Sequence, residues 1–164
     1  MTSLPDIARI VLIGIGATFV MDVWLAMLNR MGVQTLNFGL IGRWVGHLFR
    51  GRLAHASIGQ AQSIPGEVAW GWLIHYAAGI AFAGLLVAVQ GLAWTQNPSL
   101  LPAIAVGVAT VAAPLFVMQP AMGSGFAASR TPAPLMNCLR SLATHTVFGL
   151  GLYAAAVLVA SIFR

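Results

Sequence analysis

Three ionisable side chains lie inside long apolar segments of this sequence. They are Asp22 in the first segment, His75 in the second and His145 in the fourth. An Asp at the centre of a membrane-spanning helix costs about 2.5 to 3.5 kcal/mol on insertion scales, so such residues mark sites. Two imidazoles and a carboxylate can bind Zn²⁺ or Fe²⁺, hold a proton near neutral pH, or form a hydrogen-bonded Asp–His pair. These three residues are our candidate site for a proton, a divalent metal ion or a small ligand.

Each candidate belongs to a stripe of small and polar residues on one helix face. Small residues let helix backbones approach closely, and polar residues are costly in lipid, so we expect each stripe to face the interior of a helix bundle. The stripes are Gly14, Thr18, Asp22, Leu25 and Asn29; Glu67, Gly71, His75 and Gly79; and Ser141, His145, Gly149, Leu152 and Ala156.

The three candidates also lie at similar depths. Measured along the helix from the charged residue that borders each segment on one side, Asp22 and His75 lie about 12 Å deep and His145 about 7 to 8 Å deep. Three helices can therefore each contribute one group to a single layer, with Glu67 and Gln119 nearer its mouth. An alternative explains the same residues: Asp22 bonds a neighbouring helix, and each His is a satisfied polar group of the bundle.

Composition identifies the elements that must position these groups. Of 164 residues, 59% are hydrophobic and 7% charged, with a mean hydropathy of +0.89, whereas soluble domains have about 25% charged residues. Four apolar segments, about residues 7–28, 68–94, 100–118 and 142–163, each supply the roughly 20 helical residues that cross a bilayer. We expect one all-α integral membrane domain over residues 1–164, a bundle of four transmembrane helices. Pro114 predicts a kink in the third segment.

The positive charge predicts the orientation of the bundle. The net charge of +5 comes from eight arginines, with no lysine. All eight flank apolar segments, a pattern that sets membrane orientation and is unlike the basic groove of a nucleic-acid-binding protein. Only Arg9 and Arg164 lie on the side of the termini, which predicts that both termini are periplasmic and that the first and third loops are cytoplasmic. The six arginines of the opposite side are Arg30, Arg43, Arg50, Arg52, Arg130 and Arg140.

The first loop contains an amphipathic segment over residues 38–53, which predicts an interfacial helix on the anionic cytoplasmic leaflet. Arg43, His47 and Arg50 share the polar face and are predicted to contact anions or lipid phosphates, although a plain amphipathic connector explains the same pattern. Several glycines weaken the helix prediction. His55, further along the loop, is predicted to be solvated. The apolar face comprises Phe38, Ile41, Val45, Leu48, Phe49 and Leu53.

The third loop, residues 119–132, combines glycines with an arginine. Gly123 and Gly125 would let backbone N–H groups surround an anion, and Arg130 would add a positive charge. Thr131 followed by Pro132 is a good helix start. Helix-breaking loop chemistry explains the same residues, so both interpretations of this loop stay open.

Reactive side chains are scarce. Cys138 is the only cysteine, so the chain has no intrachain disulfide, no Cys-x-x-Cys metal pair and no covalent haem attachment motif. No nucleophile with an adjacent base is recognisable from spacing, which favours a non-enzymatic protein. Asp22 interrupts the first apolar segment, and no small-x-small cleavage site follows it, so we expect a retained span rather than a signal peptide.

Short motifs in three of the apolar segments and in the third loop carry a family resemblance. They are Gly14-x-x-Ala17-Thr18 with Met21-Asp22; Gly71-Trp72 with His75-Tyr76; Gln119-Pro120 through Arg130-Thr131-Pro132; and His145 with Phe148-Gly149 and Gly151-Leu152-Tyr153. Together they resemble a family of small bacterial inner-membrane proteins catalogued only as a domain of unknown function. Over nearly the whole chain, this resemblance implies four helices and a bacterial inner membrane, and it implies no activity.

Three kinds of function fit these observations best, and an enzyme that acts on a lipid-soluble substrate ranks after them. The first is transport or sensing through the polar site of Asp22, His75 and His145. The second is electron transfer by haem b, with His75 and His145 as axial ligands between facing helices. The third is an accessory or structural protein that binds lipid, a second copy of itself or a larger membrane complex. Membrane lipids are the expected partners in all three cases.

Overall fold

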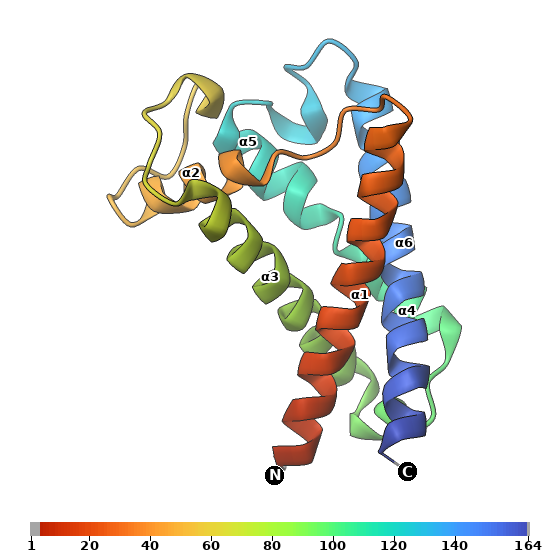
Figure 1. Ribbon diagram of the computed structural model, residues 1–164. Helices are drawn as coiled ribbons and strands as arrows, with labels where there is room; N and C mark the ends of the chain where they lie inside the picture. Colours follow the sequence, from red (N-terminus) through yellow and green to blue (C-terminus); the bar gives the residue numbers. More distant parts are fainter. Residues whose placement is uncertain (1–3, 164) are drawn as a thin grey trace. The chain divides into compact units, whose positions relative to one another are not determined.

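The computed structural model describes residues 4–163, and in this part of the chain it contains helices and no strand. A single π-helical turn, η3 (Pro114–Met118), and short 3-10 turns at Ile58–Gln60, Leu92–Thr95 and Phe126–Ala128 join the α-helices. This confirms the all-α prediction. The α-helices are α1 (Leu4–Arg30), α2 (Phe38–Leu48), α3 (Glu67–Gln90), α4 (Leu100–Ala109), α5 (Gln119–Met122) and α6 (Pro134–Ile162) (Figure 1).

Within residues 4–163, four helical stretches are long and apolar enough to cross a membrane: Leu4–Arg30, Glu67–Gln90, Leu100–Met122 and Pro134–Ile162. They coincide with the four predicted segments, but some ends differ. α3 ends at Gln90 instead of near residue 94, because Gly91 has a φ of +84°, which breaks the helix. α6 begins at Pro134, because proline is well accommodated in the first turn of a helix. The residues between Pro134 and the predicted start near residue 142, some of them polar, therefore belong to this helix rather than to a loop.

The third stretch is interrupted, as Pro114 predicts. α4 ends at Ala109, and the π-helical turn η3 begins at Pro114. Proline lacks an N–H group and its ring clashes with the carbonyl of the preceding turn, so the helix widens instead of continuing its regular bonding. The predicted kink therefore takes the form of a π-helical turn, after which the chain continues into α5.

Contacts divide the chain into two compact units. The helical unit comprises the described residues among 4–34, 76–110 and 143–163, and the loop unit comprises residues 35–75 and 111–142. The first and third loops thus belong to one unit, and both ends of the described chain belong to the other. The single domain expected from the sequence stays a prediction.

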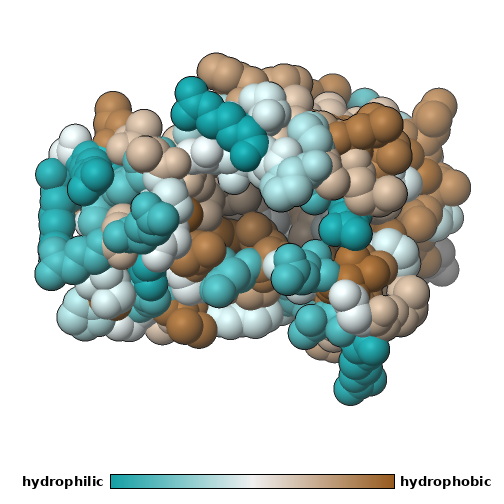
Figure 2. All heavy atoms as spheres, turned by 90° about the horizontal axis from the view of Figure 1, so that it is seen from above, coloured by the Kyte–Doolittle hydropathy of each residue, from teal (hydrophilic) through white to brown (hydrophobic). Residues whose placement is uncertain are grey.

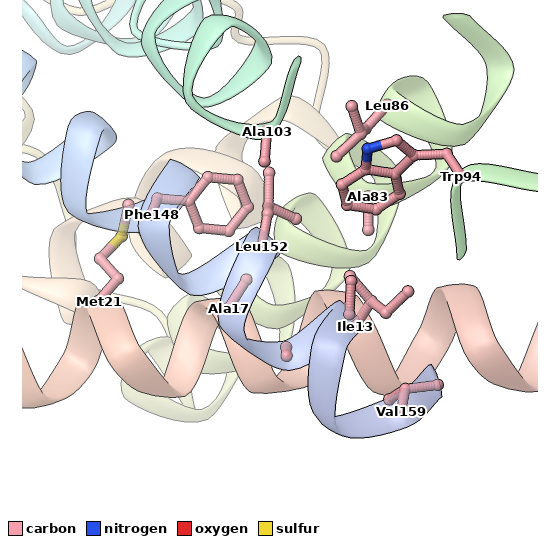
Figure 3. Packing of buried hydrophobic residues seen from close by; sticks show 12 residues of the cluster. Ile13, Ala17, Met21, Ala83, Leu86, Trp94, Ala103, Phe148, Leu152 and Val159 are labelled. Atoms are coloured by element: carbon pink, nitrogen blue, oxygen red, sulfur yellow. The ribbon is translucent and has the colours of Figure 1, made fainter. Parts of the chain in front are cut away.

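The helical unit has an apolar core to which α1, α3, α4 and α6 all contribute. Leu152 and Phe148 of α6 point toward the side chains of the other helices, as Figure 3 shows, and both are less than 3% exposed. The core consists of Ile13, Ala17, Met21, Ala83, Leu86, Trp94, Ala103, Phe148, Leu152, Ala155, Ala156 and Val159.

Glycines allow close helix crossings in this unit, and two of them bring the helix backbones especially near to each other. A Cβ atom placed on Gly14 of α1 would lie 2.5 Å from the Cα atom of Ile80 of α3, and one on Gly107 of α4 would lie 2.5 Å from the Cα atom of Gly149 of α6. Backbones this close exclude any side chain at the crossing point. The prediction that Gly14 and Gly149 lie on packed faces is confirmed.

In the loop unit, α2 packs against the start of α3. The side chain of Asn37 caps α2 by accepting a 2.9 Å hydrogen bond from the N–H group of Gly39. Ile41 and Val45 are buried, so the apolar face of α2 is covered by protein rather than laid on lipid as predicted. The helix ends at Leu48 instead of continuing to residue 53.

The end of α2 is followed by a turn in which Gly51 has a φ of +77°, a backbone conformation incompatible with helix. Phe49 and Leu53, which flank this turn, are 78% and 69% exposed. On the face seen in Figure 2, hydrophilic side chains gather on the left, where the first loop lies. The outer part of the predicted interfacial segment is therefore a turn with both apolar and charged side chains at the surface.

Candidate functional site

Asp22 of α1 and Tyr76 of α3 are hydrogen-bonded within the helical unit. The Tyr76 hydroxyl group donates to Asp22, with 2.8 Å between Oη and Oδ2. Thr18 and Gly14, one and two turns before Asp22 on the same face, are buried against α3. The small residues of the stripe thus bring α3 close enough for the tyrosine to reach the carboxylate. The prediction that the Asp22 stripe faces other helices is confirmed for these three positions.

Tyr76 is a site residue that the sequence argument did not select. It follows His75 directly and therefore lies at the same depth to within about 1.5 Å. Successive residues point about 100° apart around a helix, and depth alone cannot decide which of the two side chains is directed at α1. The adjacent motif His75-Tyr76 was the available signal.

His145 of α6 bonds to Thr110, the residue that follows α4. The distance between His145 Nδ1 and Thr110 Oγ1 is 2.9 Å, and the same hydroxyl group donates to the carbonyl oxygen of Gly107 at 2.6 Å. A hydroxyl group has one proton, so the Thr110 oxygen accepts from an N–H group on Nδ1 of His145. This assigns the tautomer of the neutral ring and makes Nε2 its basic atom.

A third cross-helix hydrogen bond lies beside these two. Nε1 of Trp24 on α1 donates to Oγ1 of Thr144 on α6 at 3.3 Å. Trp24 is two residues from Asp22, and Thr144 adjoins His145. The polar contacts therefore form one layer that links α1, α3, α6 and the end of α4. Two of the three predicted site residues, Asp22 and His145, belong to this layer.

His75 belongs to the loop unit by its contacts. Its ring lies against Phe38 of α2, with 4.6 Å between ring centroids, and against Trp72, with 5.9 Å. Among residues 4–163, no three His, Cys, Asp or Glu side chains form a group that could hold a metal ion. The structure thus gives no support to a metal centre of Asp22, His75 and His145, and the haem b hypothesis stays a prediction.

Glu67, predicted near the mouth of the site, pairs with Arg43 of α2. Two parallel bonds join them: Nη2 to Oε1 at 2.8 Å and Nε to Oε2 at 2.9 Å. This bidentate geometry is the strong form of a carboxylate–guanidinium pair, and the hydrogen bond to Glu67 raises the pKa of Arg43 above its ordinary value. The side chains are only 14% and 20% exposed.

Arg43 also organises the first loop. Its Nη1 atom donates to the carbonyl oxygens of Ile58, Gly59 and Ala61, at 3.3, 3.2 and 3.1 Å. The N–H group of Ile64 donates to Glu67 Oε2 at 3.2 Å. The structure gives Arg43 this role in the first loop, and its predicted contact with anions or lipid phosphates stays a prediction.

The two histidines of the first loop are buried. His47 and His55 are each 6% exposed, and the backbone N–H group of His55 donates to the carbonyl oxygen of Ala121 in α5 at 2.8 Å. The prediction that His55 is solvated is therefore wrong. It failed because a polar loop sequence carries no signal for a contact between residues 66 positions apart. His47 is covered by protein, and its predicted contact with anions or lipid stays a prediction.

The third loop closes mainly on itself. The N–H groups of Ser129, Arg130 and Thr131 donate to carbonyl oxygens within the loop at 3.0, 2.9 and 2.9 Å, so these three donors do not surround an anion. Gln119 has a buried Oε1 atom without a hydrogen-bond partner in the described structure. Arg130 and Arg50 are exposed, and their contacts with anions or lipid stay predictions.

Comparison with known proteins supports the resemblance carried by the four motifs. The sequence model of a family described as "Protein of unknown function (DUF2938)" matches residues 11–159. No curated protein and no solved structure matches the chain. The matched range contains Asp22, Tyr76 and His145 and both polar loops.

Proposed function

Because this chain belongs to the DUF2938 family of proteins of unknown function, we propose its function from its polar layer, its apolar surface and its distribution of charge. The protein is a multi-pass protein of the bacterial inner membrane that binds and exchanges a proton at Asp22, in transport or sensing. The hydrogen bond between Tyr76 and Asp22, at 2.8 Å, carries this proposal.

Exposed apolar side chains support the membrane setting. Phe19, Leu101 and Leu158 are 61%, 79% and 61% exposed although they lie on helices of membrane length. Apolar surface on this scale is costly in water and favourable in lipid. The distribution of arginines supports cytoplasmic loops and periplasmic termini, and a reporter fused to the C-terminus tests that orientation.

The chemistry of the Asp22–Tyr76 pair suits proton exchange. An ionised carboxylate only accepts hydrogen bonds, whereas a protonated one can also donate, and a tyrosine hydroxyl group can do either. When Asp22 takes up a proton, the direction of the bond can reverse while both oxygen atoms stay in place. His145, in the same layer, offers Nε2 as a second basic atom. Asp and His side chains within membrane-spanning helices are common components of proton relays.

The test is infrared difference spectroscopy of the full-length protein in lipid nanodiscs during a pH titration. A protonated carboxyl group has a C=O stretching band that the carboxylate lacks. We expect such a band in the wild type, its loss in Asp22→Asn, and its shift in Tyr76→Phe. Asp6→Asn, in the first turn of α1, is the matched control and should retain the band.

An Asp22→Asn protein with the wild-type carboxyl band would overturn the proposal. The proposal is also overturned if every titrating carboxyl band of the folded wild-type protein belongs to Asp6 or Glu67. Proton uptake into liposomes, measured with an enclosed pH-sensitive dye, then distinguishes transport from sensing: a transporter shows flux that Asp22→Asn abolishes, and a sensor shows none.

A further inference from the structure

The loop unit contains a buried pair of histidines that the proposed proton site does not use. His47 lies near the end of α2 and His55 in the segment that follows. Their rings meet edge to face at 73°, with 4.9 Å between centroids, and Nε2 of His55 lies 3.1 Å from Nδ1 of His47. Each residue is 6% exposed. Buried and mutually bonded histidines are suited to respond to pH.

The hydrogen bonds assign a tautomer to each neutral ring. Nε2 of His47 lies 2.8 Å from the carbonyl oxygen of Gln62, and a carbonyl only accepts, so this nitrogen bears the proton. Nδ1 of neutral His47 is then an acceptor, and Nε2–H of His55 donates to it. Nδ1 of His55 is left as an unprotonated nitrogen, buried and without a hydrogen-bond partner among the described residues.

The pair is also the point at which the first loop meets α5. Besides the hydrogen bond from the His55 N–H group to Ala121, the backbone of residues 55–56 packs against Gly123. A Cβ atom on Gly123 would lie 2.6 Å from the carbonyl carbon of Ala56 and 3.0 Å from the carbonyl oxygen of His55. The first loop passes beside α5 in Figure 1. A change of charge at His55 therefore acts directly on the contact between the first and third loops.

We propose that the His47–His55 pair is a proton-binding switch that holds the first loop on α5 while it is neutral and releases it when His55 is protonated at Nδ1. Under the orientation proposed above, the switch responds to the pH of the cytoplasm. It is independent of proton binding at Asp22.

In the closed loop, burial and both of the ionisable side chains that act on His55 oppose its protonation. Burial, then Arg52 of the same segment, then His47 of α2 lower the pKa of His55, and only its backbone contact with Ala121 acts in the opposite direction. α5 has the sequence Gln-Pro-Ala-Met and presents no ionisable side chain. In the opened loop, His55 regains an ordinary pKa of about 6.5.

The sign of the pH effect follows. Above about pH 6.5 His55 is neutral in both forms, and the closed contact has its full stability. Below that pH the opened form binds the proton more tightly, so opening is favoured by up to about tenfold for each further pH unit, until His55 becomes charged in the closed form as well.

The test is hydrogen–deuterium exchange of the full-length protein in nanodiscs, at about pH 7.5 and about pH 5, corrected for intrinsic exchange rates. We expect peptides that cover residues 53–62 and 119–125 to lose protection at the lower pH. His55→Gln keeps a donor near the position of Nε2 and cannot be protonated, so it should remain protected at both pH values. His145→Gln, in the helical unit, should respond as the wild type does.

Equal protection of the wild type at both pH values would overturn the switch, as would an unchanged pH response in His55→Gln. If His55→Gln is unprotected at every pH, imidazole ¹⁵N spectra of the wild type decide the matter. The switch predicts two neutral rings protonated at Nε2 near neutral pH and a cationic ring at low pH. Rings that stay neutral at low pH, or that are already cationic at neutral pH, contradict it.

Discussion

The helical unit and the loop unit use their polar side chains differently. In the helical unit, polar side chains bond to one another across helices, as Asp22 does with Tyr76 and His145 with Thr110. In the loop unit, Arg43 and His47 bond largely to backbone carbonyl oxygens of the first loop. The first arrangement links elements that are already hydrogen-bonded internally, whereas the second holds together a segment with little secondary structure.

This difference has a physical origin. The backbone N–H and carbonyl groups of a helix bond to one another, so they need no polar side chain as a partner. A polar side chain placed between helices costs free energy in an apolar setting, and a functional role can explain why it is there. A loop must find partners for its carbonyl and N–H groups elsewhere, and charged side chains supply them. By this comparison, Asp22 is a better candidate for a functional residue than Glu67. In the sequence the two were equivalent, because both are carboxylates on a stripe of small and polar residues.

The largest effect is expected from Arg43→Ala in the loop unit. This change leaves the Glu67 carboxylate without its guanidinium partner and three carbonyl oxygens without a donor, which should lower the free energy of unfolding by about 3 kcal/mol. Denaturant titration in detergent measures it. The double variant Arg43→Met with Glu67→Leu should recover part of the loss, and a loss under about 1 kcal/mol in Arg43→Ala would refute the structural role.

A somewhat smaller effect is expected from Gly107→Ala in the helical unit. The added Cβ atom would lie 2.5 Å from Cα of Gly149, so α4 and α6 must separate, at a cost of about 2 kcal/mol. Gly84→Ala is the matched control, because its Cβ atom would meet nothing closer than 3.9 Å and alanine favours helix by about 1 kcal/mol. Thermal unfolding of both variants measures the contrast, and equal stabilities would contradict the close crossing.

The smallest effect is expected from Arg52→Gln, which sharpens the account of the histidine pair. Arg52 helps to lower the pKa of His55, so its loss should raise that pKa toward the ordinary value. The closed and opened loops then differ less in proton affinity, and the first loop should lose less protection at about pH 5 than in the wild type. Hydrogen exchange measures this. Arg50→Gln, also exposed, is the control, and an equal response in both variants would count against the assignment.

Much of the helical architecture was predictable because its causes are local. The length and apolarity of four segments determined the four helices of membrane length, and the spacing of small residues determined that Gly14, Thr18 and Gly149 lie on packed faces. Pro114 predicted the interruption of the third membrane-length stretch, Leu100–Met122. Each of these properties depends on residues within a few turns of one another, which a sequence displays directly.

Partnerships between distant residues were not predictable in this way. Whether Tyr76 or His75 meets α1 depends on helix rotation, and the pairing of Arg43 with Glu67 depends on the path of the first loop between them. The burial of His55 depends on α5, which is remote in sequence. The sequence by itself thus determined which polar side chains are costly enough to need a partner. Only the tertiary structure decided which partner each one has. The physical reason is that a partnership depends on the rotation of helices and on the path of loops rather than on local composition.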